Sequence, residues 1–198
     1  MDKKILTPEE SFDLINKAIS NFKMNYKESG KSFLLWGWMI CLACFSHFII
    51  FKILQSKEAY EHMGLFSLGN WIVFMLTALI IQLFMQRKIN KDKKVISHVE
   101  KYINNLWWVI AASTVVATFL CIKLEIIPPP LFLLIGGIAT TITGLVIKFK
   151  PVIFGGLSFF LFSIASTLVS NENTLIIVGV AVICGYLIPG YLLKSAKE

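Results

Sequence analysis

Six apolar runs separated by short polar segments dominate the chain. The runs hold 17 to 22 residues, and about 20 helical residues span a hydrocarbon core. A membrane barrel would alternate apolar and polar residues, whereas these runs are apolar on every face. The pattern predicts an all-α, polytopic membrane bundle with six transmembrane helices, at 33–54, 67–85, 106–124, 131–147, 152–169 and 175–193.

The first 30 residues predict an amphipathic helix of their own. Thr7, Pro8 and Glu10 are residue types preferred at the N-cap, N1 and N3 positions of a helix, and Gly30 is a typical stop. Apolar residues recur at 3–4 spacing between these limits and form one narrow stripe, made of Phe12, Ile15, Ile19, Phe22 and Tyr26.

The loop 86–105 carries a similar pattern at Ile89, Ile96, Val99 and Ile103, which predicts a second amphipathic helix. Two interpretations of these helices stay open. They lie on the inner membrane surface, or they pack together or with a second subunit as a cytoplasmic helical platform, since the stripe is as narrow as a coiled-coil seam.

The basic residues are distributed unevenly between the polar segments. Of 19 lysines and arginines, all but Lys52, Lys57 and Lys123 fall in segments that share one side of the membrane. By the positive-inside rule, both termini are predicted to be cytoplasmic. The net charge of +7 therefore indicates topology and attraction to anionic lipid headgroups, and no nucleic-acid partner is expected.

Polar chemistry inside the runs is sparse. Charged side chains within a membrane usually mark ion or proton paths, but no Asp, Glu, Lys or Arg lies in the middle of a run. His47 and Gln82 are the candidate intramembrane polar site. For His47 the alternatives are a proton or metal site, a pH sensor, or a neutral imidazole hydrogen-bonded between helices. Cys41 and Cys44 form a C-x-x-C without further ligands, so no metal is expected.

The motifs of membrane enzymes are incomplete. Gly156-Leu157-Ser158 has the form of a rhomboid nucleophile, but the sixth run holds no histidine base, and no cofactor-binding fingerprint is present. Neither catalysis nor a cofactor is therefore expected. Small residues predict close helix packing or an oligomer face in the last three runs, at Gly136, Thr140, Gly144, Gly155, Gly156 and Gly185.

Two segments carry a family resemblance. A lysine-containing amphipathic helix runs into Ser32-Phe33-Leu34-Leu35-Trp36-Gly37-Trp38, and the polar segment 94–103 leads into Leu106-Trp107. Over roughly the first 110 residues the chain resembles an uncharacterised family of multi-pass inner-membrane proteins from Bacteroidota. Genes of such families often lie near one for a winged-helix transcription regulator, so the resemblance implies a membrane partner in a regulated stress or envelope system.

Three hypotheses of function follow. The first is a non-enzymatic scaffold or sensor, expected to be a homo-oligomer, whose basic amphipathic helices recruit a cytoplasmic protein or anionic lipid. The second is a small-solute channel or transporter with a nearly neutral path near His47 and Gln82. The third, a membrane-embedded lipid-modifying enzyme, lacks a catalytic constellation.

Overall fold

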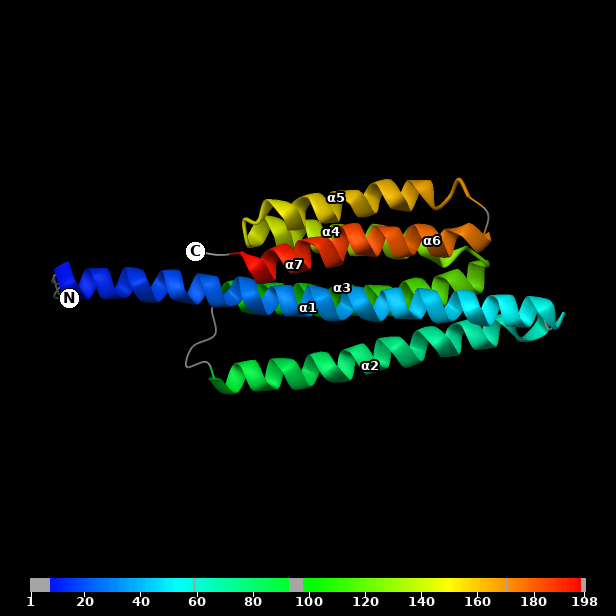
Figure 1. The fold of residues 1–198 in the computed structure, drawn as a ribbon, viewed down its shortest axis with the longest axis horizontal. Helices are drawn as coiled ribbons and strands as arrows, with labels where there is room; N and C mark the ends of the chain where they lie inside the picture. Colours follow the sequence, from blue (N-terminus) through cyan, green and yellow to red (C-terminus); the bar gives the residue numbers. More distant parts are fainter. Residues whose placement is uncertain (1–7, 59, 93–97, 170, 197–198) are drawn as a thin grey trace.

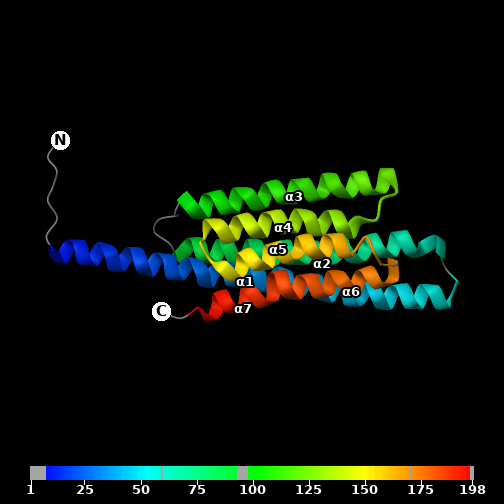
Figure 2. The ribbon, with the colours of Figure 1, turned by 90° about the horizontal axis from the view of Figure 1, so that it is seen from above.

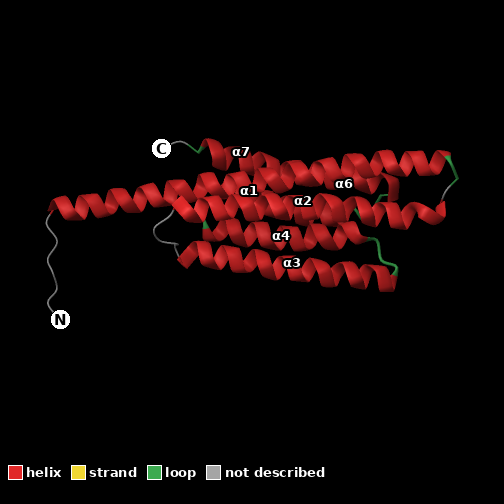
Figure 3. Cartoon of the chain, turned by 90° about the horizontal axis from the view of Figure 1, so that it is seen from below, coloured by secondary structure: helices red, strands yellow, loops and turns green. Residues whose placement is uncertain are grey.

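The computed structural model describes residues 8–58, 60–92, 98–169 and 171–196, without the side chains of 8–27, 60, 90–92, 98 and 171–172. Every element of secondary structure among them is helical (Figure 3). The elements are α1 (Pro8–Ser56), η1 (Tyr60–His62), α2 (Met63–Asp92), α3 (His98–Leu124), α4 (Pro128–Val146), α5 (Lys150–Ala165), α6 (Asn171–Val182), η2 (Ile183–Leu187) and α7 (Ile188–Ser195). The predicted all-α class is confirmed.

The helices run up and down along one long axis (Figures 1 and 2). α6, η2 and α7 follow one another in a single rod, and η2 is a π-helical turn. Pro189 explains that turn, because its ring lacks an N–H and would clash with the carbonyl four residues earlier in a regular helix. The N-terminal part of α1 and the end of α7 lie at one end of the bundle, the terminal end, while the C-terminal end of α1 lies at the opposite, distal end (Figure 1).

Five helices are long and apolar enough to cross a membrane: Glu28–Ser56, Met63–Ile89, Val99–Leu124, Pro128–Val146 and Asn173–Ser195. α5 has 16 residues and is about 24 Å long, which is shorter than a hydrocarbon core of about 30 Å. The prediction of six spanning helices is therefore supported for five, and α5 packs against α4 as a shorter sixth helix.

The predicted helix end at Gly30 is wrong, because α1 continues unbroken through it. Gly30 serves packing instead of capping. A Cβ atom added there would lie 3.0 Å from the carbonyl oxygen of Gly190 and 3.0 Å from the amide nitrogen of Lys194. A glycine in this helix therefore lets the backbones of α1 and α7 approach closely.

The predicted separate helix at 86–105 is also wrong for the described part of that loop. Residues up to Asp92 continue α2, and residues from His98 belong to α3. The sequence after the second apolar run contains no glycine or proline before Asp92, so nothing ends the helix at the membrane boundary.

Close backbone approaches hold the second half of the bundle together. α4 and α5 form a hairpin in which Gly156 lies against Thr141, and Gly144 lies against Val152 and Ile153. Phe159 of α5 stacks edge-on against Tyr186 of η2, with 4.9 Å between ring centroids. By contrast, only 6% of the apolar window of α2 and 11% of that of α3 are buried, so most of their surface is available to lipid.

Replacing Gly156 by alanine should lower the free energy of unfolding by about 1–3 kcal/mol, the usual cost of overpacking. The new Cβ would lie 2.5 Å from the backbone nitrogen of Thr141. Gly179→Ala is the matched control, because a Cβ atom there meets nothing within 4 Å, and alanine favours a helix by up to about 1 kcal/mol. Denaturation in mixed micelles measures both variants, and equal stability of the two would contradict the close α4–α5 approach.

Candidate functional site

The candidate intramembrane polar residues lie on the interface between α1 and α2, here called the α1–α2 seam. Four hydrogen bonds lie at two levels of this seam, and each joins a side chain of α2 to a side chain or a backbone carbonyl of α1. In a membrane these contacts matter because lipid offers no partner for a polar group.

The distal level of the seam pairs two dipeptides, Ser46-His47 on α1 and Asn70-Trp71 on α2. The Ser46 hydroxyl donates to Oδ1 of Asn70 at 2.6 Å, and Nδ2 of Asn70 donates to the Ala43 carbonyl at 3.0 Å. The Trp71 indole N–H donates to Nδ1 of His47 at 3.0 Å. His47 is therefore hydrogen-bonded between helices, and its ring stands edge-on to the indole.

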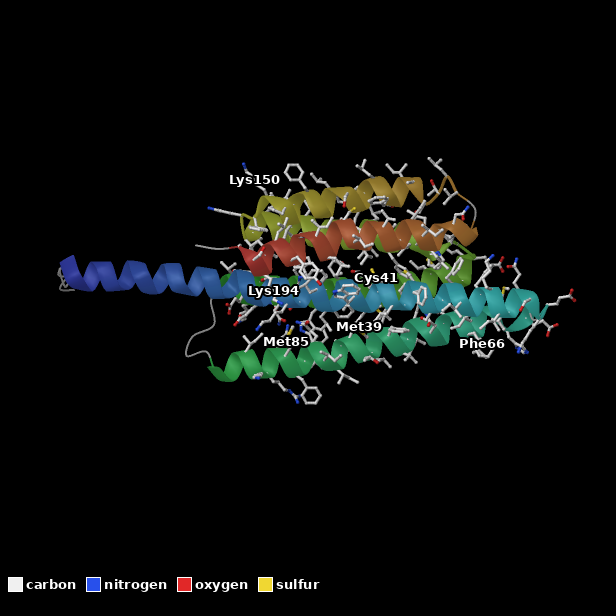
Figure 4. The ribbon with its side chains drawn as sticks, viewed as in Figure 1. Met39, Cys41, Phe66, Met85, Lys150 and Lys194 are labelled. Atoms are coloured by element: carbon white, nitrogen blue, oxygen red, sulfur yellow. The ribbon has the colours of Figure 1, made fainter. Side chains whose placement is uncertain are left out.

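The terminal level of the seam contains Gln82. Its Nε2 donates to the Ser32 hydroxyl at 3.0 Å, while its Oε1 is buried without a hydrogen-bond partner among the described residues. One turn further along α2, Nε2 of Gln86 lies 3.5 Å from Oδ1 of Asn104 on α3. Met39 and Met85 lie between α1 and α2 (Figure 4).

The structure does not bring His47 and Gln82 together. Ser32, the partner of Gln82, is 15 residues before His47 on α1, which corresponds to about 22 Å of helix. Ala78 lies between the two levels on α2 and is fully buried. This separation does not favour a single polar site that contains both candidate residues.

Most side chains of the two predicted apolar stripes, on residues 12–26 and 89–103, are not among those that the structure describes. The backbone of Phe12, Ile15, Ile19, Phe22 and Tyr26 belongs to α1, and Ile96 lies outside the described residues. Val99 is exposed and Ile103 half-buried in the first turns of α3.

The predicted small residues lie at several helix contacts. Gly155 lies against the carbonyl oxygen of Gly185, and Gly185 lies against the ring of Phe159. Gly136 faces the Tyr186 hydroxyl, which also contacts the Thr140 side chain. These contacts join α4, α5 and η2 within one chain.

Sequence reasoning missed Asn70, Trp71 and Ser32 as partners of the candidate residues. Asn70 carried a usable signal, because an amide inside an apolar run is as unusual as Gln82. The sequence carried no signal for the pairing of Trp71 with His47. That pairing depends on which faces of α1 and α2 are turned toward each other.

Residues of the types that bind metal ions do not cluster in the described part of the chain. No group of three or more His, Cys, Asp or Glu side chains there could hold a metal ion. Cys41, Cys44, Cys121 and Cys184 are free thiols.

By helix length and hydropathy, the chain is a multi-pass membrane protein. It matches no protein-family model, and comparisons with curated proteins and with solved structures find no similar one. Any further statement about function therefore depends on the residues and geometry described above.

Trp71→Phe should reduce the free energy of unfolding by about 0.6–1.7 kcal/mol, from the average to the maximum measured for hydrogen bonds between membrane helices. Phenylalanine keeps an aromatic ring but has no N–H for His47. Trp108→Phe is the control, because Trp108 is 53% exposed on α3. In a background carrying His47→Leu, Trp71→Phe should cost less, and an unchanged cost in that double-mutant cycle would contradict the Trp71–His47 bond.

Proposed function

We propose that this protein is a membrane scaffold or sensor that holds an amphipathic helix in the cytoplasm for a protein partner to bind. The observation that carries the proposal is the continuity of α1, which extends beyond the terminal end of the bundle (Figure 1). α1 has 49 residues, and its apolar run begins only at Phe33, so a polar N-terminal part of the same helix precedes the membrane run. This N-terminal arm, residues 8–27, is about 30 Å long.

The direction of the arm supports projection into the cytoplasm over a position on the membrane surface. A surface helix lies parallel to the bilayer plane, whereas the arm continues a helix that crosses it. Sharp bends in helices need a proline, a Gly–Ser pair or a π-bulge. Ser29-Gly30 is such a pair, but Gly30 is packed against the backbone of Gly190 and Lys194.

The arm carries the stripe of Phe12, Ile15, Ile19, Phe22 and Tyr26. An apolar stripe held away from lipid needs another protein surface to cover it. An amphipathic helix docked in an apolar groove is a common mode of recognition, and we propose this mode for a cytoplasmic partner. A second copy of the chain, paired through the same stripe as a coiled coil, is the alternative.

The proposed location is the bacterial inner membrane with both termini in the cytoplasm. Lys150 and Lys194 lie at the terminal end in Figure 4, whereas Phe66 marks the distal end. Lys52 and Lys57 lie near the distal end with Glu58 and Glu61. An excess of lysine and arginine marks the cytoplasmic side, and the terminal lysines are suited to contact anionic headgroups. The resemblance to Bacteroidota inner-membrane proteins agrees with this location.

Fluorescent labels on single cysteines test the position of the arm. The background is a chain whose four native cysteines are replaced by alanine, with Ile19→Cys on the stripe and Lys17→Cys off it. Soluble maleimide should label both sites in inside-out vesicles and neither in right-side-out vesicles. Lipids carrying a nitroxide in the acyl chain should quench neither label.

The control for this experiment is a label at Val73→Cys, because Val73 is exposed on the membrane part of α2 and its label should be strongly quenched. Quenching at Ile19→Cys as strong as at Val73→Cys would show an arm on the membrane surface and contradict the proposal. Adding the partner should slow labelling of Ile19→Cys and leave Lys17→Cys unchanged.

A further inference from the structure

A cavity of about 240 Å³ lies between α1 and α2 near the distal end of the seam. Its lining residues are His47, Ile50, Phe51, Leu54, Met63, Gly64 and Ser67. All but His47, Ser67 and Gly64 are large apolar side chains. The volume is slightly below the range of about 300–1,000 Å³ known for ligand pockets, so it suits a single ring or head group.

The hydrogen bond from Trp71 determines which nitrogen of His47 carries the proton. An indole N–H can only donate, so Nδ1 of His47, at 3.0 Å, accepts. The neutral imidazole must then carry its proton on Nε2. That N–H donates to no other group in the described part of the chain. His47 therefore brings one unused hydrogen-bond donor to the cavity.

Ser67 brings a second unused polar group. Ser67 lines the same cavity. Its hydroxyl makes no hydrogen bond with any described residue, in contrast to Ser46, which donates to Asn70. An unpaired polar group away from water costs about 1–3 kcal/mol. A ligand that accepts hydrogen bonds from both groups would remove this cost.

The depth of the cavity limits the charge of its ligand. His47 lies nine residues before Ser56, the last residue of the candidate span, which places it about 14 Å along the helix from that end. A charged group is expensive at this depth. Leu54, Met63 and Gly64 line the other end of the cavity, within two residues of the span ends, so the depth argument applies to the His47 end. The part of the ligand that reaches His47 must therefore be neutral and must carry a hydrogen-bond acceptor.

We propose that this cavity binds the carbonyl-bearing head of a neutral, membrane-dissolved molecule. The His47 Nε2–H and the Ser67 hydroxyl donate to its carbonyl oxygens, and Ile50, Phe51, Leu54 and Met63 surround its apolar body. Two sources share this chemistry: a lipid-soluble quinone, and a neutral ester lipid such as a diacylglycerol. This site lies apart from the N-terminal arm, and its test does not depend on the arm.

Gly64 and Gly69 provide a matched pair of variants. A Cβ atom added at either glycine meets nothing within 4 Å, so both positions accept larger side chains without a clash. Gly64 lines the cavity and Gly69 does not. Gly64→Leu should therefore fill the cavity, while Gly69→Leu leaves it open, and both changes favour a helix.

The experiment measures the rise in Tm of the purified full chain when a decyl-substituted benzoquinone or a diacylglycerol is added. Decylbenzene, which has no carbonyl group, is the control compound. A saturable rise is expected with the quinone or the ester in the unmodified chain and in Gly69→Leu. Gly64→Leu should abolish it. His47→Leu and Ser67→Ala should each weaken binding by about tenfold, the loss of one hydrogen bond.

The two carbonyl compounds distinguish the sources. A rise with the quinone alone identifies a quinone site, and a rise with the diacylglycerol alone identifies an ester-lipid site. The proposal is overturned if neither compound raises Tm, if decylbenzene acts equally well, or if Gly64→Leu responds like Gly69→Leu. Ser67→Ala removes only a hydroxyl group, so it keeps the test informative if His47→Leu does not fold.

Discussion

The packing of α1 against the C-terminal rod is the contact on which the rest of the bundle depends. Lipid is as apolar as the helix surfaces, so membrane helices associate through close packing and not through a hydrophobic drive. Gly30 and Gly37 let α1 approach Gly190 and Leu187, and the Phe33 ring lies 5.6 Å from that of Tyr186. Tyr186 sits in η2, the π-helical turn that Pro189 requires. A proline near the membrane boundary thus helps to hold the longest helix.

This contact gives α1 two roles. Its N-terminal part extends beyond the bundle (Figure 1), and its later part forms one wall of the His47 cavity. Polar pairs of the seam join α2 to α1, and most of the remaining surface of α2 faces lipid.

The sequence predicted the features that follow from placing the chain in lipid, namely the helical class and the membrane-spanning helices. Long apolar runs must be helical in lipid because every backbone group needs a partner, and five of them are helices long enough to span. The failures share one cause. Gly30 carries the signal of a helix stop, but a glycine that caps a helix and one that packs against a neighbour look alike in sequence. Likewise, His47 was visible as a candidate, while its partner Trp71 depends on helix rotation, which no local pattern encodes.

The continuity of α1 is the central claim, and a distance within the helix tests it most directly. Spin labels at Lys17→Cys and Lys52→Cys, in a chain lacking native cysteines and diluted with unlabelled chain in bicelles, report this distance by pulsed electron resonance. An unbroken helix of 35 residues between these positions predicts about 52 Å between the labels. A right-angle bend at Gly30, with the arm on the membrane surface, would shorten the distance to about 38 Å. The shorter distance would contradict the account.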